Sequence, residues 1–201
     1  MINYSYLALG DSYTIGEQIP FAENFPNQTV QLLREMGFAF YAAEIIAKTG
    51  WATDELNNAV ESTTFLKKYD IVSLLIGVNN QYRGRSAFQF KIEFEQLLQK
   101  AIQFADDNSS RVFILSIPDW GVTPFAEGRD RKQVADEIDA YNAVCENSAA
   151  AFKTHYINIT ASQRLDGNKM EFLAADGLHP SGMEYKKWAD KLAEAVIKVL
   201  G

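Results

Sequence analysis

The chain has 201 residues, of which 47% are hydrophobic and 22% are charged, and its formal net charge is -7. This length and composition are typical of one globular domain, so we expect residues 1–201 to form a single domain. The acidic balance disfavours a nucleic-acid partner and electrostatic binding to anionic membranes. No apolar run approaches the roughly 20 residues that a membrane span needs.

The first residues, MINYSYLALGDS, contain neither a basic segment nor the apolar run of a secretory signal, so we expect a cytoplasmic protein. Cys145 is the only cysteine, which excludes an intrachain disulfide. It lies in an apolar-periodic segment and is interpreted as a buried small hydrophobic residue. Nothing in the sequence indicates the oligomeric state.

Short apolar runs alternate with longer amphipathic segments along the chain. The apolar runs predict five strands, at residues 4–9, 40–46, 71–76, 112–117 and 156–159. The amphipathic segments predict five helices, at residues 27–36, 53–60, 86–105, 129–152 and 181–200, with Thr53 and Ser181 as N-caps. This alternation is typical of a mainly parallel sheet with helices on both faces.

Ligands of such sheets bind outside the carboxyl ends of the strands. The first strand is followed there by Ser12, in the run Gly10-Asp11-Ser12-Tyr13. A serine hydroxyl is a weak nucleophile at neutral pH and needs an adjacent base. The run Asp176-Gly177-Leu178-His179 offers both a base and a carboxylate to orient it, because a spacing of three lets one turn present both side chains together.

Acyl transfer through a serine also needs donors for the developing oxyanion. Gly50 follows the second strand, and its backbone N–H is open to close approach. Asn79 follows the third strand and offers a side-chain amide. The backbone N–H of Ser12 is the third candidate donor.

These segments resemble the four sequence blocks of the SGNH hydrolases, also called the GDSL esterase/lipase family. The matching residues are Gly10-Asp11-Ser12, Gly50, Gly77-Val78-Asn79 and Asp176-Gly177-Leu178-His179, in the family's order. The resemblance spans residues 7–180. It implies a three-layer α/β/α sandwich of the flavodoxin-like kind. It also implies hydrolysis of esters or thioesters through an acyl-serine intermediate, without a metal or organic cofactor.

The chain departs from the family pattern at two positions. Tyr13 stands where the family has leucine, and Asn80 stands where an aspartate usually follows the third block. The second change leaves the candidate oxyanion donor Asn79 in place. It alters the anchoring of the neighbouring loop, so a substrate preference cannot be carried over from relatives.

Several further residues are candidates for contacting a substrate. Aromatic side chains suit both acyl and sugar groups, and arginines suit acidic groups, although packing or a solvated loop explains such residues equally well. The candidates are Tyr13, Trp51, Arg83, Trp120 and Phe125, with Arg85 left open. With only two histidines and one carboxylate–histidine pair, the sequence predicts no metal site.

The sequence thus predicts a serine esterase or acylhydrolase with Ser12, His179 and Asp176 in a catalytic triad, acting on a small ester substrate. Two alternatives stay open. One is a carbohydrate O-acetyl esterase, and the other is a non-catalytic module that binds an acyl or sugar group on the same fold.

Overall fold

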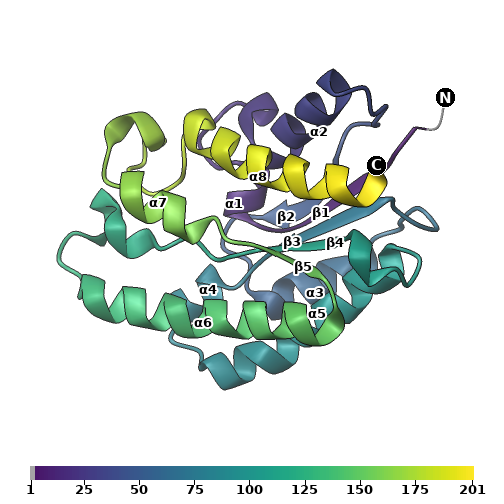
Figure 1. Cartoon of the computed structure of the whole chain (residues 1–201). Coiled ribbons are helices and arrows are strands. Elements are labelled where there is room, and N and C mark those ends of the chain that lie inside the picture. Colours follow the sequence, from purple (N-terminus) through teal and green to yellow (C-terminus); the bar gives the residue numbers. More distant parts are fainter. Residues whose placement is uncertain (1–2) are drawn as a thin grey trace.

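Five parallel strands form the centre of the computed structural model, which describes residues 3–201 (Figure 1). The strand order across the sheet is β2-β1-β3-β4-β5. The strands are β1 (Tyr6–Asp11), β2 (Glu44–Lys48), β3 (Ile71–Leu75), β4 (Val112–Leu115) and β5 (His155–Ile157). Strands β1 and β3 are neighbours although β2 lies between them in the chain, so the direction of winding changes at this pair.

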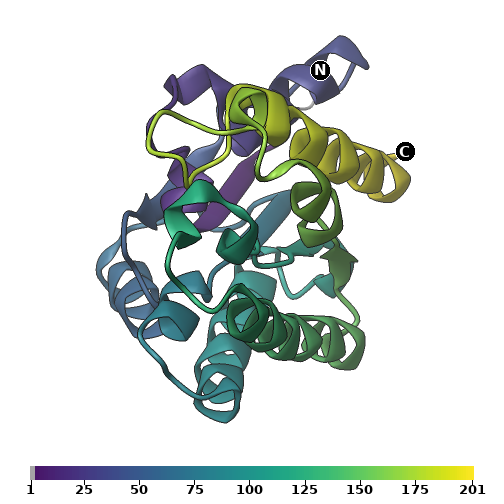
Figure 2. The ribbon, with the colours of Figure 1, turned by 90° about the vertical axis from the view of Figure 1, so that its left-hand side faces the viewer.

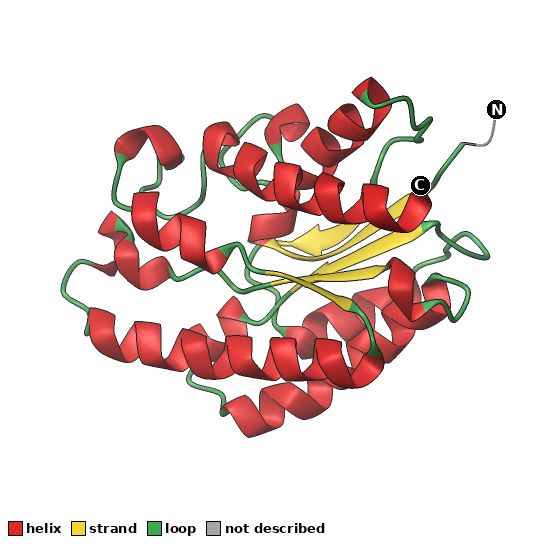
Figure 3. Ribbon diagram, in the orientation of Figure 1, coloured by secondary structure: helices red, strands yellow, loops and turns green. Residues whose placement is uncertain are grey.

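Helices cover both faces of the sheet, which confirms the predicted three-layer α/β/α sandwich (Figure 3). Helices α2 (Phe25–Glu35) and α8 (Gly182–Leu200) pack together on one face. Helices α3 (Thr53–Ser62), α5 (Ala87–Phe104) and α6 (Arg131–Phe152) lie on the other. The shorter helices are α1 (Ser12–Ile15), α4 (Val78–Tyr82) and α7 (Thr160–Asp166).

The burial of the strands explains their sequence pattern. Every residue of β1, β3 and β4 is buried, whereas β2 and β5 at the edges of the sheet are only partly buried. A strand covered by helices on both faces is mostly apolar rather than alternating, because neither of its faces meets water. The continuous apolar runs of the sequence therefore correspond to the three central strands.

The predicted element boundaries differ from the observed ones in instructive places. The first strand continues through Gly10 to Asp11. The second strand begins only at Glu44, and Phe40, where we predicted its start, forms an isolated parallel bridge with Tyr4 instead. The N-cap of α3 is Ala52, so the prediction of Thr53 was wrong; the Glu55 carboxylate accepts the Ala52 N–H at 2.9 Å. The predicted N-cap of α8, Ser181, occupies that position but makes no capping bond with its side chain.

Candidate active site

Ser12 follows the last residue of β1 at the carboxyl-end rim of the sheet and begins helix α1. Figure 2 looks onto this end of the strands. The N-cap of this one-turn helix is Asp11, whose Oδ1 accepts the Tyr13 N–H at 3.0 Å. Gly10 allows the turn to lie directly on the sheet, because a Cβ at this position would come within 2.5 Å of the Leu75 carbonyl oxygen. The backbone of Ser12 is therefore fixed between strand β1 and helix α1.

A second segment, far away in sequence, completes a chain of hydrogen bonds from this hydroxyl. The Nε2 atom of His179 lies 2.9 Å from Ser12 Oγ, and His179 Nδ1 lies 2.6 Å from Asp176 Oδ2. A proton on Nδ1, donated to the carboxylate, leaves Nε2 free to accept the serine proton. The hydroxyl, imidazole and carboxylate are therefore in hydrogen-bonding order.

The turn that carries Asp176 and His179 is organised by the carboxylate itself. Asp176 Oδ1 accepts the backbone N–H groups of Leu178 and His179, each at 3.0 Å. Burial alone would raise the pKa of Asp176. The hydrogen bonds from the His179 side chain and from these two backbone groups outweigh the burial and lower the pKa of Asp176 below its ordinary value. This carboxylate therefore stays ionised at neutral pH.

The Tyr13 ring packs against the His179 imidazole. Its ring centroid lies 5.1 Å from that of His179, and it also packs against Trp188 of α8. Only 2% of Tyr13 is exposed, so the structure explains its ring by packing, and its contact with a substrate stays a prediction. A bulky aromatic ring at this position fills the space between the turn and helix α8.

Gly50 lies in the turn that follows strand β2 and has φ of +83°, a conformation that glycine adopts without strain. No atom lies within 4 Å of the place that a Cβ would occupy, so the backbone is what requires glycine here. Asn79 lies in helix α4, and one N–H of its amide donates to the Trp51 carbonyl oxygen at 2.9 Å. Its nitrogen carries a second hydrogen that this bond does not use.

Asn80 anchors the start of helix α3. Its Oδ1 accepts the Thr53 N–H at 3.1 Å, and its Nδ2 donates to Thr53 Oγ1 at 2.6 Å and to Glu93 Oε2 at 3.4 Å. An amide can donate to the threonine and to the glutamate, whereas an aspartate here would place a second carboxylate beside Glu93. The departure from the family pattern is thus matched by its neighbours.

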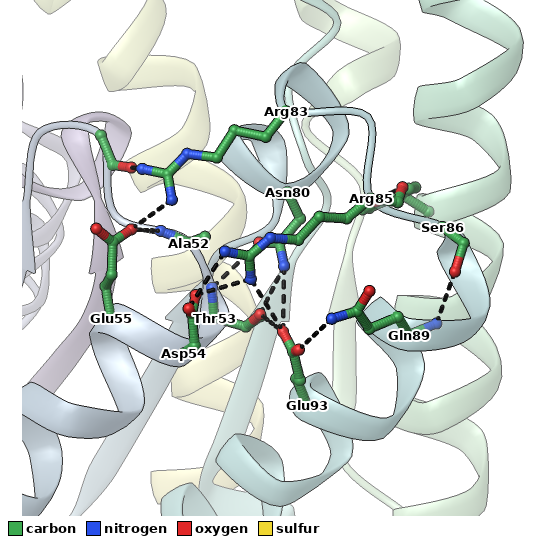
Figure 4. A network of polar contacts seen from close by, with 12 residues as sticks. Ala52, Thr53, Asp54, Glu55, Asn80, Arg83, Arg85, Ser86, Gln89 and Glu93 are labelled. Atoms are coloured by element: carbon green, nitrogen blue, oxygen red, sulfur yellow. Dashed lines mark hydrogen bonds and ion pairs between the residues drawn. The ribbon is translucent and has the colours of Figure 1, made fainter.

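Both arginines after Asn80 are bound within the protein (Figure 4). Arg83 donates to the Gly50 carbonyl oxygen at 2.7 Å and pairs with Glu55 at 2.9 Å. Arg85 pairs with Asp54 at 2.8 Å. These contacts explain both side chains without a substrate, and they tie α4 and the loop after it to the start of α3.

The remaining aromatic candidates differ in exposure. Trp120 is only 4% exposed and donates its indole N–H to Gln81 Oε1 at 2.8 Å, although it also borders a cavity. Trp51 is partly buried, whereas Phe125 is 46% exposed and its N–H donates to the Gly177 carbonyl oxygen beside the candidate triad. The sequence analysis missed Tyr82, whose half-exposed ring packs against both Trp120 and Phe125.

A cavity of about 420 Å³ lies next to these aromatic rings. Its lining combines Tyr82 and Trp120 with the polar side chains of Gln81, Gln133 and Glu137. Aromatic faces bordered by hydrogen-bonding groups suit a ligand that is partly apolar and partly polar. The sequence pattern of α4 and α6 gives no sign that these residues share one cavity.

The other titratable groups singled out in the sequence lie elsewhere. Cys145 is buried, and burial raises the pKa of its thiol, as expected of an inert core cysteine. His155 stacks on Phe113 and bonds to the Ser110 carbonyl oxygen. Within residues 3–201, no three His, Cys, Asp or Glu side chains gather as a metal site would require. No helix in this part of the chain is long and apolar enough to cross a membrane.

The chain thus has a serine at the rim of a doubly wound sheet, hydrogen-bonded in series to an imidazole and a carboxylate. This arrangement is typical of α/β proteins that resemble serine hydrolases. The sequence profile of the GDSL-like Lipase/Acylhydrolase family matches residues 8–187. The chain belongs to this family, which confirms the resemblance noted in the sequence. No curated protein matches the chain significantly.

Solved structures with the same fold cover nearly the whole chain. A lipase/acylhydrolase from Enterococcus faecalis is similar with a TM-score of 0.74 and 19% identity, over 98% of this chain and 95% of that one. An acetylxylan esterase from Geobacillus stearothermophilus has a TM-score of 0.75 and 17% identity, over 96% and 94%. A member of the lipolytic G-D-S-L family from Veillonella parvula has a TM-score of 0.74 and 17% identity, over 96% and 97%. At these identities, the likeness shows the fold.

Proposed function

We propose that the protein is a serine ester hydrolase that forms an acyl-serine intermediate. The observation that carries this proposal is the continuous hydrogen-bonded series from Ser12 Oγ through the His179 ring to Asp176. Membership of an acylhydrolase family supports it at the level of the reaction class. Every group that the chemistry needs is supplied by the chain itself, so the mechanism calls for no metal or organic cofactor.

In the proposed mechanism, Ser12 Oγ attacks the ester carbonyl carbon while His179 Nε2 takes the serine proton. The C=O π electrons move to the carbonyl oxygen, and this oxyanion accepts hydrogen bonds from the N–H groups of Ser12 and Gly50 and from the unused N–H of Asn79. When the tetrahedral intermediate collapses, His179 returns its proton to the leaving alcohol. Water, deprotonated by His179, then attacks the acyl carbon. The bond from this carbon to Ser12 Oγ breaks, His179 returns the proton to Ser12 Oγ, and the acid is released.

Ser12→Ala tests the nucleophile directly. We expect the turnover of a p-nitrophenyl acyl ester to fall by about 10⁴ or more while the fold, checked by circular dichroism, is unchanged. Mass spectrometry after fluorophosphonate treatment should find the label on Ser12 alone. A folded wild-type sample that is neither labelled nor active would instead support a binding module.

Asn79→Ala tests the oxyanion donor. Removal of one such donor costs roughly 10²–10³ in kcat, and KM should change little because the bond forms in the transition state. The amide also donates to the Trp51 carbonyl oxygen, and both Asn79→Ala and Asn79→Asp lose this bond; Asn79→Asp is the companion variant because it keeps the side-chain volume but has no N–H to give. Wild-type rates in both variants would remove Asn79 from the mechanism.

An ester of a carbohydrate is the second candidate substrate class. The cavity beside Tyr82 and Trp120 combines aromatic faces with amide and carboxylate groups, which suits a sugar better than a long acyl chain. The fold neighbour from Geobacillus stearothermophilus is an acetylxylan esterase. A panel of p-nitrophenyl esters of increasing acyl length, together with acetylated sugars, lysophospholipids and acyl thioesters, distinguishes these classes. A preference for long acyl chains would exclude the carbohydrate assignment.

A further inference from the structure

The turn after strand β2 carries the proposed donor Gly50, yet glycine is the residue least able to hold its own conformation. With φ of +83° and open space around its Cα, it has no side chain to fix it. Glycine populates positive and negative φ about equally readily, so the direction of its N–H must be fixed from outside. A donor aids an oxyanion only when it already points at the right place before the reaction.

The carbonyl end of Gly50 is held by Arg83. The guanidinium Nη2 donates to the Gly50 carbonyl oxygen at 2.7 Å, and the next N–H along the chain, that of Trp51, donates to the Lys48 carbonyl oxygen at 3.2 Å. The peptide unit between Gly50 and Trp51 is therefore bound on both sides. Fixing this unit restricts the ψ angle of Gly50, so fewer orientations remain open to the Gly50 N–H on the other side of the Cα.

The same arginine also holds the far side of the turn. Its Nη1 pairs with Glu55 Oε2 at 2.9 Å, and that carboxylate accepts the Ala52 N–H at 2.9 Å (Figure 4). The planar fork of the guanidinium reaches the Gly50 carbonyl and the Glu55 carboxylate at once. A lysine ammonium, which is a single point on a flexible stem, cannot keep both contacts in this geometry.

Helix α4 connects this clamp to Asn79. Arg83 is the C-cap of α4, and its N–H donates to the Asn79 carbonyl oxygen at 3.1 Å. The Asn79 side chain holds the Trp51 carbonyl oxygen at 2.9 Å. Two side chains of one short helix thus hold two successive carbonyls of the turn, those of Gly50 and Trp51.

We propose that Arg83 is a positioning residue that aims the Gly50 N–H at the oxyanion. This inference rests on the proposed function, because it takes Gly50 as an oxyanion donor. Arg83 itself needs no contact with the substrate. The side chains of Arg83 and Glu55 are about two-fifths exposed, at 41% and 40%, and exposed ion pairs contribute little to folding. The effect of Arg83 should therefore be on the rate and not on stability.

Arg83→Gln and Arg83→Lys test the proposal, with Arg111→Gln as the matched control. Arg111 also bonds to a backbone carbonyl and a carboxylate, both of Asp70, but just before β4, at the opposite end of the strands from Ser12. With a short-chain p-nitrophenyl ester, Arg83→Gln should lower kcat by about 10- to 100-fold and change KM less than threefold, since a misdirected donor costs part of its full value. The kcat of Arg83→Lys should lie between those of Arg83→Gln and the wild type, and the kcat of Arg111→Gln should equal that of the wild type.

A tetrahedral mimic gives a readout that a general loss of structure would not produce. An alkylboronic acid bonds to the serine oxygen as a tetrahedral anion, so its inhibition constant should rise by the same factor as kcat falls. Glu55→Gln, which keeps the Gly50 contact but weakens the pair, should show a smaller loss. This variant keeps the proposal testable if Arg83→Gln fails to fold.

Three results would overturn the proposal. One is a kcat within twofold of wild type in folded Arg83→Gln. Another is a higher KM at unchanged kcat, which would place Arg83 in contact with the substrate. The third is an equal loss of kcat in Arg111→Gln. A wild-type protein that lacks Ser12 labelling and activity overturns the proposed function itself, whereas an active, labelled wild type with an equally active Arg83→Gln overturns only the role of Arg83.

Discussion

Two aspartates lie close to Ser12, and their surroundings differ in opposite ways. Asp176 is partly exposed and accepts three hydrogen bonds, which lower its pKa. Asp11 is fully buried, and one of its oxygens, Oδ2, has no hydrogen-bond partner among residues 3–201. Burial raises the pKa of Asp11 to about 7, although the bond from the Tyr13 N–H acts in the opposite direction.

The comparison separates two tasks that a carboxyl group can perform beside a nucleophile. In the mechanism that we propose, the charge of Asp176 stabilises the imidazolium formed during catalysis. Asp11 uses one oxygen to cap helix α1, a task that a neutral carboxylic acid or an amide also performs. Adjacency to Ser12 in the chain therefore does not make Asp11 the carboxylate that pairs with His179, because the distant Asp176 makes that hydrogen bond.

Of the variants that test this comparison, Asp176→Asn should have the largest effect, and the effect should be on kcat. An amide cannot hold the imidazole in the required tautomer, so kcat should fall by about 10³–10⁴ with the fold unchanged. Steady-state kinetics on a p-nitrophenyl ester measure the loss. Asp11→Asn is the matched control and should stay within about tenfold of the wild type. A larger loss in Asp11→Asn than in Asp176→Asn would reverse the assigned roles.

The next largest effect should be the change in protein stability with pH that Asp11 causes. In the unfolded chain Asp11 loses its proton near pH 4, but in the folded protein it keeps the proton up to about pH 7. The folded state binds more protons in this window, so the stabilisation from Asp11 is present below pH 4 and is lost as the pH rises through 7. The loss amounts to up to about 4 kcal/mol in the free energy of unfolding.

Urea unfolding of the wild type and Asp11→Asn between pH 4 and 8 isolates this contribution. The variant has no proton to lose at this position, so its stability should improve relative to the wild type as the pH rises. A stability difference between the two proteins that stays constant across the range would show that Asp11 does not titrate there. The stabilisation from Asp176, whose pKa is lowered, is fully present above about pH 4 and is lost only as the pH falls below this range.

We expect the smallest effect from Asp11→Ala, which measures the contribution of the α1 cap to the free energy of unfolding. Compared with Asp11→Asn at pH 5, it should lose about 1 kcal/mol of unfolding free energy, because the Tyr13 N–H loses its acceptor. Urea unfolding with both variants in the same buffer measures this difference. Equal stability would mean that the bond from Tyr13 does not contribute.

The sequence was sufficient for the fold class because the central strands are mostly apolar and the long helices are amphipathic. It was not sufficient for α1, α4 and α7, which are too short to show a helical period. The residues that the structure brings together at Ser12 were all named from sequence. Their roles remain predictions that the variants above test.

The substrate contacts were the least predictable part. Whether an aromatic residue faces a ligand depends on what covers it, and nothing near Tyr13 in sequence announces that Trp188 of α8 will pack against its ring. Trp120 is covered in the same way by partners from α4. Tyr82 was overlooked because exposure on a helix of five residues leaves no pattern.

Ser12 and His179 stand 167 positions apart, so the hydrogen bond between them closes most of the chain into one loop. The Tyr13 ring that supports His179 is itself packed against α8, the last helix to emerge during synthesis. A folding intermediate with the sheet formed but α8 undocked would have a serine without its base. Recovery of fluorophosphonate reactivity during refolding should therefore lag behind the far-ultraviolet circular dichroism signal and report the docking of α8.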